Sequence, residues 1–157
     1  MHIGVIFDSV YGNTRQVATA IAEGLAHGNT VDTLTVTEAR DADLSSFDLL
    51  IIGSPTRGFR PTPATSDFVA GLKPSITRAV KAAAFDTRIA LADIHPAPLR
   101  WVVEAGGYAA DRIQMLLSER GFALAGKGAG FEVSGTEGPL KAGELERAAD
   151  WARALAA

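Results

Sequence analysis

The chain has 157 residues, of which 47% are hydrophobic and 21% are charged, and its formal net charge is −3. This length and composition predict one globular domain, residues 1–157, that buries a core of its own. The chain contains no cysteine, which excludes disulfides, thiolate metal sites and thiol catalysis. Any redox chemistry would therefore need a bound organic cofactor.

Charge, histidine spacing and hydropathy also argue against several classes of partner, namely nucleic acids, metal ions and membranes. The chain carries no basic cluster, so nucleic acid is not an expected partner. The three histidines, His2, His27 and His95, lie far apart in the sequence and lack the spacing of metal ligands. No run reaches the roughly 18–20 apolar residues of a membrane span, and the chain opens on a strand pattern rather than on a signal peptide. We expect a cytoplasmic protein with no metal site and no membrane contact.

The first half of the chain alternates short apolar runs with helical patterns. A helix is predicted over 14–26, where apolar residues recur at helical spacing, and Gly28 follows it as a stop signal. The crossover 36–46 is short and polar, which predicts a weak helix or none. Three strands are predicted in this half, at His2–Phe7, Thr30–Thr35 and Asp48–Gly53.

The second half continues the alternation. Thr62-Pro63 predicts the capped start of a helix, whereas 86–108 is irregular except for a short helix near 98–104. Two more helices are expected around Ile113–Leu117 and Leu145–Leu155, the latter after a turn rich in glycine and proline. Two more strands are predicted, at Ala79–Phe85 and Lys127–Val133. This alternation predicts a three-layer α/β/α sandwich around a five-stranded parallel sheet.

The loop "DSVYGNT", residues 8–14, joins the first predicted strand to the first helix. A helix N-terminus has unpaired backbone N–H groups and a positive dipole end, so it favours an anion, and phosphate in particular. Ser9 and Thr14 add hydroxyls, Asn13 adds an amide, and Gly12 permits a tight turn. The loop has neither the Gly-Lys-Ser/Thr ending of a P-loop nor the G-x-G-x-x-G pattern. It predicts an anion site; the alternative is a helix cap and a turn.

The stretch "SVYGNT" after a first strand resembles the phosphate loop of the flavodoxin family, which wraps the phosphate of FMN. In this chain, Val10 and Tyr11 stand where the family usually has hydroxyl residues, so the backbone N–H groups would carry more of the binding. The resemblance implies a flavodoxin-like fold with strand order 2-1-3-4-5. It also implies that FMN is bound by Ser9, Val10, Tyr11, Gly12, Asn13 and Thr14.

Two further stretches carry the resemblance. "GSPTRGF", residues 53–59, follows the third predicted strand, as the second flavin loop of the family does, and Phe59 offers a ring to stack on the flavin. "FDTR", residues 85–88, ends the fourth predicted strand, where the family has its third flavin loop. As in flavodoxin, these loops would meet at the carboxyl ends of the strands. The implied cofactor contacts are Ser54, Pro55, Thr56, Arg57, Gly58 and Phe59, then Asp86, Thr87 and Arg88.

Residues 86–108 offer candidates for the second face of the flavin, namely His95, Trp101 and Tyr108. Trp101 stands among valines, which predicts a packed side chain. Gly107 and Tyr108 precede a helix, and we expect them to touch the edge of the ring. Trp151 lies on the last predicted helix and is expected to be a core residue.

Three arginines, Arg57, Arg60 and Arg88, lie in or beside the proposed flavin loops. The electron-carrying members of the family that this chain resembles are typically markedly acidic, whereas this chain has a net charge of only −3. Our hypothesis is that one or more of these cations stabilises the reduced flavin or a substrate anion.

The resemblance implies an FMN protein that carries electrons from a reductase to an acceptor protein, as a monomer or a weak homodimer. One alternative is an FMN-dependent NAD(P)H:quinone reductase, because "GSPTR" also resembles the corresponding loop of such enzymes. The chain is short, however, for the extra loops with which those enzymes shape a second substrate site. The other alternative is a flavin-free interaction module, which Val10 and Tyr11 favour. We expect an electron carrier rather than a stand-alone oxidoreductase.

Overall fold

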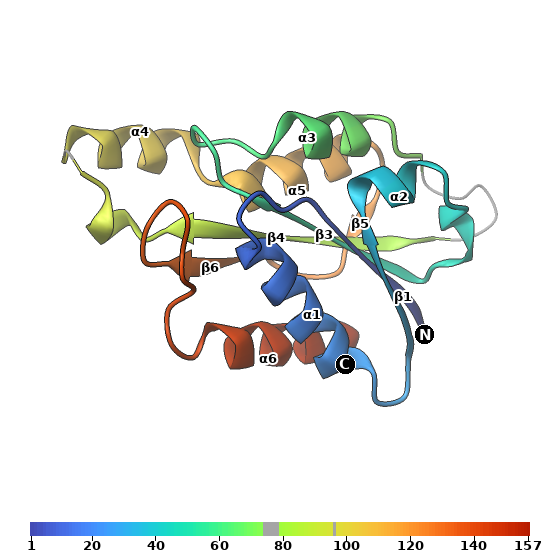
Figure 1. The fold of residues 1–157 in the computed structure, drawn as a ribbon. Coiled ribbons are helices and arrows are strands. Elements are labelled where there is room, and N and C mark those ends of the chain that lie inside the picture. The colour runs from blue at the N-terminus through green and yellow to red at the C-terminus, as the bar shows by residue number, and fades with distance from the viewer. Residues whose placement is uncertain (74–78, 96) are drawn as a thin grey trace.

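The strands of the chain form one parallel sheet with helices on both of its faces (Figure 1). The computed structural model describes residues 1–73, 79–95 and 97–157, of which 103–106 by their backbone alone. The sheet begins with β2 (Thr30–Thr35) at one edge, followed by β1 (His2–Phe7), β3 (Leu49–Pro55) and β4 (Lys81–Ile89). The predicted order 2-1-3-4-5 is therefore confirmed up to its fourth position.

The fifth position of the sheet is shared by two segments. β5 (Ala123–Leu124) pairs with the start of β4, and β6 (Ala129–Val133) pairs with its end, both in parallel. The predicted strand Lys127–Val133 thus starts two residues too early. Two glycines interrupt the pairing, and the carbonyl of Gly126 instead accepts a hydrogen bond from Gln114 of the neighbouring helix at 3.0 Å. The strand order is confirmed, with the fifth strand broken in two.

β4 is longer than the sequence predicts. Its register with β6 runs from Phe85 opposite Ala129 to Ile89 opposite Val133. Asp86, Thr87 and Arg88 therefore lie inside a strand, and their placement in a loop after the strand was wrong. The physical reason is that β6 supplies backbone partners at this edge, which local polarity does not reveal.

The helices form two layers (Figure 1). α1 (Asn13–Leu25) and α6 (Glu144–Ala156) pack together on one face of the sheet. The other face carries α2 (Val36–Arg40), α3 (Pro63–Ala70) and α5 (Ala109–Glu119). Thr62 caps α3, and proline follows it in the first turn, as predicted. α4 (Pro98–Gly106) follows a 3₁₀ turn at Leu91–Asp93 and contacts it.

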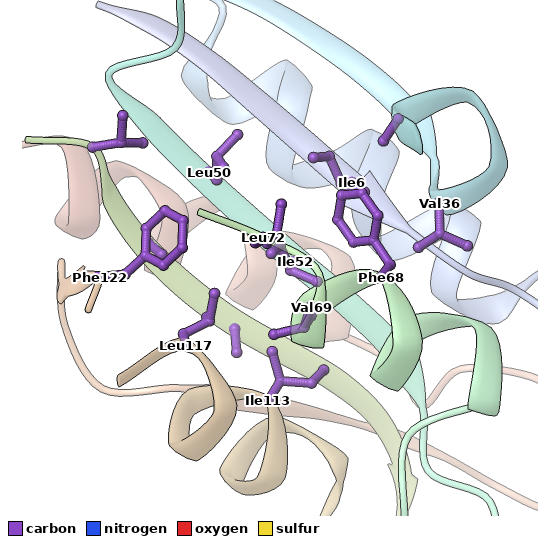
Figure 2. Close-up of a cluster of buried hydrophobic side chains, with 14 of the residues drawn as sticks. Ile6, Val36, Leu50, Ile52, Phe68, Val69, Leu72, Ile113, Leu117 and Phe122 are labelled. Carbon is purple, nitrogen blue, oxygen red and sulfur yellow. The ribbon is translucent and has the colours of Figure 1, made fainter. Parts of the chain in front are cut away.

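Alternate side chains of the central strands pack into two separate hydrophobic cores, one on each face of the sheet. In β1, Ile6 points to the face covered by α3 and α5, where it joins Ile52, Phe68, Val69 and Ile113 (Figure 2). Residues 3, 5 and 7 of the same strand point to the opposite face and pack against α1 and α6. Because both faces are covered, these strands are apolar throughout. This burial fixes the strands, and hence the loops that leave their carboxyl ends.

Trp151 of α6 packs against the second core, as predicted. Its ring meets those of Phe85 and Phe131 edge to face, with ring centres 6.3 and 6.0 Å apart, and its Nε1 donates to the carbonyl of Lys127 at 3.1 Å. Within the described ranges, no helix combines the length and apolar character needed to cross a membrane.

Candidate functional site

A cavity of about 500 Å³ lies where β1, β3 and β4 end, which is within the roughly 300–1,000 Å³ typical of small-molecule sites. Each strand that ends here is followed by a segment that contributes to the wall. The residues that line the cavity are Val10, Tyr11, Asn13, Thr14, Pro55, Thr56, Arg57, Gly58, Phe59, Thr87, Arg88, Ile89, Asp93, Ile94, His95, Leu99, Tyr108, Val133 and Thr136.

The loop after β1 enters α1 through a left-handed residue. Gly12 is the N-cap of α1, with φ of 94° and with open space where a Cβ would lie. Only glycine adopts this conformation freely. The hydroxyl of Ser9 accepts hydrogen bonds from the N–H of Gly12 at 3.2 Å and of Arg15 at 3.4 Å. Ser9 therefore shapes the loop from within instead of facing the cavity.

The polar side chains at the start of α1 have partners in the protein. Asn13 donates its Nδ2 to the carbonyl of Glu137 at 3.1 Å, and Thr14 and Thr87 share a hydroxyl–hydroxyl bond of 2.8 Å. By contrast, among the described residues no acceptor lies within bonding distance of four backbone N–H groups, those of Val10, Tyr11, Asn13 and Thr14. A ligand at this end of the cavity would thus meet backbone donors first.

The loop after β3 closes in a tight turn. Arg57 and Arg60 exchange backbone hydrogen bonds of 2.7 and 3.1 Å, and the two residues between them, Gly58 and Phe59, have φ of 54° and 66°. Two positive φ values in succession define a type I′ turn. Among the described residues, Phe59 is the one non-glycine with positive φ. A bulky residue held in this conformation is a mark of functional sites.

Hydroxyl groups behind the cavity fix this loop to its neighbours. Ser54 is fully buried and accepts from the N–H of Thr62 at 3.0 Å, while the Thr62 hydroxyl donates to the Asp8 carboxylate at 2.5 Å. Thr56 joins two further elements, since its N–H donates to the carbonyl of Thr87 at 2.9 Å and its hydroxyl accepts from Ala109 at 3.1 Å. The turn is therefore positioned by the residue after β1, by β4 and by the starts of α3 and α5.

A buried ion pair forms the floor beside β4. Asp86 is fully buried and accepts two hydrogen bonds of 2.7 Å from Arg88 and one of 2.8 Å from the N–H of Ala110. Burial raises the pKa of Asp86 above the usual range for aspartate, and the pairing with Arg88 opposes this shift. The guanidinium of Arg88 lies 3.8 Å from the ring centre of Tyr108, whose hydroxyl donates to the carbonyl of Ile89 at 3.1 Å.

A family model described as a flavodoxin domain matches residues 4–85 of the sequence, which is more than half of the chain. The chain belongs to the flavodoxin family. The match runs from β1 through the first five residues of β4, and so covers the loops after β1 and β3. No curated protein matches the sequence significantly.

Solved structures of flavodoxins have the same fold. Flavodoxin 2 from Bacillus cereus superimposes with a TM-score of 0.74 at 23% identity, with 99% of this chain and 98% of that chain covered. Flavodoxin 1 from the same organism gives 0.72 at 20% identity, with 99% and 97% covered. A rubredoxin oxygen:oxidoreductase from Desulfovibrio gigas gives 0.67 at 20% identity, but this chain spans only 35% of its length.

The flavodoxin loops expected from the sequence meet at one cavity. Twelve of the seventeen expected contacts line the wall of this cavity, and five do not. Ser9, Gly12, Ser54 and Asp86 stand behind the wall and position it, and Gly107 lies against the carboxylate of Asp111. The expected contacts that line it are Val10, Tyr11, Asn13, Thr14, Pro55, Thr56, Arg57, Gly58, Phe59, Thr87, Arg88 and Tyr108.

The cavity is also lined by residues that the sequence did not single out, namely Ile89, Asp93, Ile94, Leu99, Val133 and Thr136. Ile89, Asp93 and Ile94 reach the cavity because β4 continues to Ile89, beyond its predicted end at Phe85. Val133 ends β6 and Thr136 follows it, and the rule that parallel strands present their carboxyl ends at one edge would have pointed to both. His95 lines the cavity and is exposed.

The three arginines proposed to supply charge differ in their surroundings. Arg88 lines the cavity but is paired with Asp86, whereas Arg60 is not among the lining residues. Arg57 lines the cavity, has no acidic partner in the described part of the chain, and lies 5.8 Å from the ring centre of Tyr11. Among the three arginines, Arg57 is therefore the one that lines the cavity without an acidic partner in the described part of the chain.

The prediction that Trp101 is packed was wrong. Its side chain is 82% exposed. The valines beside it predict a buried position only where the helix has a neighbour to pack against, and α4 contacts mainly the 3₁₀ turn before it. The exposed ring is thus a surface feature of α4.

Proposed function

We propose that the cavity binds FMN and that the protein carries electrons between a reductase and an acceptor protein. The observation that supports this most directly is the set of four unpartnered N–H groups at the start of α1, next to a cavity of suitable size. These groups replace the hydroxyls that Val10 and Tyr11 lack. The residues present therefore fit the phosphate of a flavin nucleotide.

The remaining walls suit the flavin ring. Phe59 and Tyr108 present aromatic rings to the cavity, and Pro55 and Ile89 add apolar surface. Gly58 has open space where a Cβ would lie, which permits close approach of a ligand to the backbone. When bound, FMN would supply the electron-transfer chemistry, and the residues of this chain would bind it, orient it and set the charge around it.

Exposed apolar side chains favour a carrier over a self-contained enzyme. Val10, Tyr11 and Leu99 line the cavity and are 47%, 48% and 37% exposed, and Trp101 and Val102 are exposed on the same helix as Leu99. Large apolar residues exposed near one opening are typical of a surface that meets another protein. An electron carrier needs such a surface beside its cofactor.

The decisive experiment is a titration of the purified apoprotein with FMN, followed by flavin absorbance and fluorescence. A saturable spectral shift supports the proposal, and the absence of binding would leave a flavin-free interaction module. The holoprotein is then mixed with NADH or NADPH, with and without a quinone. A flavin that stays oxidised until a separate reductase protein is added supports a carrier, whereas rapid quinone reduction by NADH or NADPH would indicate a reductase.

A further inference from the structure

The loop between β6 and α6 forms one wall of the cavity. Residues 134–140 fold back in a narrow hairpin, because the N–H of Ser134 donates to the carbonyl of Pro139 at 2.8 Å and the N–H of Lys141 donates to that of Glu132 at 2.9 Å. Thr136 of this segment lines the cavity, as does Val133, the last residue of β6. The segment lies outside residues 4–85, which match the family model.

The hairpin is held from both sides of the cavity. On one side, Asn13 donates to the carbonyl of Glu137, and a Cβ on Gly138 would lie only 2.6 Å from the Asn13 side-chain oxygen. On the other side, the ammonium of Lys141 lies 2.6 Å from the carboxylate of Asp93, which also lines the cavity. Thr136 is therefore held at a defined place relative to the start of α1.

Thr136 has a hydroxyl that is free to meet a ligand. Over the residues that the structure describes, its Oγ1 has no hydrogen-bond partner. The next residue, Glu137, accepts a hydrogen bond from Asn13, the first residue of α1. The polar side chains of the phosphate loop are already engaged, as Ser9, Asn13 and Thr14 show. A hydroxyl from a distant loop thus lines the same cavity as the residues whose backbone N–H groups lack acceptors, and the residue after it is bonded to Asn13.

We propose that Thr136 donates a hydrogen bond to the phosphate of the bound flavin nucleotide, and that Asn13 is a positioning residue that holds it there. The inference rests on the proposed FMN binding. It explains how this chain tolerates Val10 and Tyr11 in its phosphate loop, because a donor from outside the loop compensates for a missing hydroxyl. It also gives the Asn13 amide a role in holding a wall of the cavity rather than in touching the ligand.

The test compares FMN with riboflavin, which lacks the phosphate, on wild type, Thr136→Val and Thr136→Ser. A hydrogen bond to a charged group corresponds to about ten-fold to one-hundred-fold in affinity. Thr136→Val should weaken the affinity for FMN by at least about ten-fold and leave the affinity for riboflavin within about two-fold of wild type. Thr136→Ser, which keeps the hydroxyl, should restore the affinity for FMN. Thr33→Val, on the exposed edge strand β2, is the matched control and should change neither affinity.

A double-mutant cycle tests the role of Asn13. If Asn13 positions the hydroxyl, Thr136→Val should cost less than about two-fold in FMN affinity when Asn13 is already alanine. Equal losses in both backgrounds would overturn the positioning role, and an unchanged FMN affinity in Thr136→Val would overturn the whole inference while leaving FMN binding intact. Failure of the wild type to bind FMN would overturn both proposals.

Discussion

Gly130 of β6 lies directly against the guanidinium of Arg88 in β4. A Cβ atom on Gly130 would stand 1.9 Å from Nε of Arg88, so any side chain at this position would force the guanidinium to move. Gly130 is the cross-strand neighbour of Asp86, so its lack of a side chain lets Arg88 fold back onto that buried carboxylate. One glycine thus permits the ion pair that forms the cavity floor.

Replacement of Gly130 by alanine should destabilise the protein. The added methyl group displaces Arg88 and leaves Asp86 buried without its cation, and breaking such a pair costs about 3–5 kcal/mol when no solvent relieves it. Because Arg88 is partly exposed, we expect a loss of about 2–4 kcal/mol in the free energy of unfolding. Urea unfolding measures it. Gly71→Ala is the matched control, since its Cβ would have no contact closer than 3.6 Å; equal stabilities of the two variants would contradict the prediction.

Glu144 gives the fold a defined dependence on pH. Two hydrogen bonds from Arg147, with a further one of 2.6 Å from the N–H of Glu132, hold the pKa of Glu144 below its ordinary value. A carboxylate with a lowered folded-state pKa contributes stability that is fully present above its unfolded pKa, about 4.3, and that is lost as pH falls through the folded value.

Glu144→Gln should therefore lower the free energy of unfolding by about 1 kcal/mol at pH 7, an amount already reduced for solvent screening. The difference from wild type should shrink as the pH is lowered through the folded-state pKa of Glu144. Denaturant unfolding at pH 7 and at acidic pH measures it, with Glu146→Gln in the same helical turn as the control for the helix dipole. A difference that is the same at both pH values would show that the carboxylate charge is not the cause.

The local sequence predicts those parts of the fold in which burial and pattern agree. The bounds of β1 and β2 are as predicted, because apolar or alternating residues fill them from end to end. The end of β4 was missed because Asp86 and Arg88 satisfy each other inside the sheet, and a charge pair within a strand has the same composition as a loop. The break between β5 and β6 depends on Gln114 reaching the backbone from α5, a contact between distant residues.

The site shows the same division between local and tertiary information. The loops after β1 and β3 carry recognisable motifs, so most of the cavity residues that they contribute were predicted. The role of each residue within a motif was not predicted, because it depends on distant partners: Asn13 bonds a residue 124 positions away. Thr136 has no motif around it, and the contact between the loop after β6 and the start of α1 is what brings it to the cavity.

Phe59 is expected to bind the flavin ring rather than its phosphate. Phe59→Asn removes the aromatic surface but keeps a residue that tolerates positive φ, so the free energy of unfolding should stay within about 1 kcal/mol of wild type. The affinities for FMN and riboflavin should fall together, by about ten-fold, because the lost contact is apolar. Fluorescence titration of both ligands measures this. A loss confined to FMN would contradict the assignment of Phe59 to the ring.

Trp101 offers a test of partner docking. Its side chain does not line the cavity and is mostly exposed, so Trp101→Ala should leave FMN affinity and stability unchanged. The rate of flavin reduction by a reductase protein should fall by about ten-fold or more if the ring is a contact of the complex. Stopped-flow measurement over a range of reductase concentrations tests it, with dithionite as the control reductant. Equal loss with dithionite would show that the substitution disturbs the flavin itself.

Arg57 should raise the reduction potential of the bound flavin, because an unpaired cation at the cavity favours the more negative, reduced state. One unit charge at a partly solvated site contributes about 0.5–1 kcal/mol at such distances, and about 1.4 kcal/mol corresponds to 59 mV for one electron. Arg57→Gln should therefore lower the midpoint potential by roughly 20–40 mV at low ionic strength.

The shift should shrink at high salt, because the charge is exposed and becomes screened. Potentiometric titration at low and high ionic strength measures both effects, and Arg40→Gln on α2, an exposed arginine outside the cavity lining, is the charge-matched control. Arg88 is expected to differ from Arg57, since its charge is already balanced by Asp86. If Arg40→Gln shifted the potential as much as Arg57→Gln, net charge rather than a cation at the cavity would set the potential.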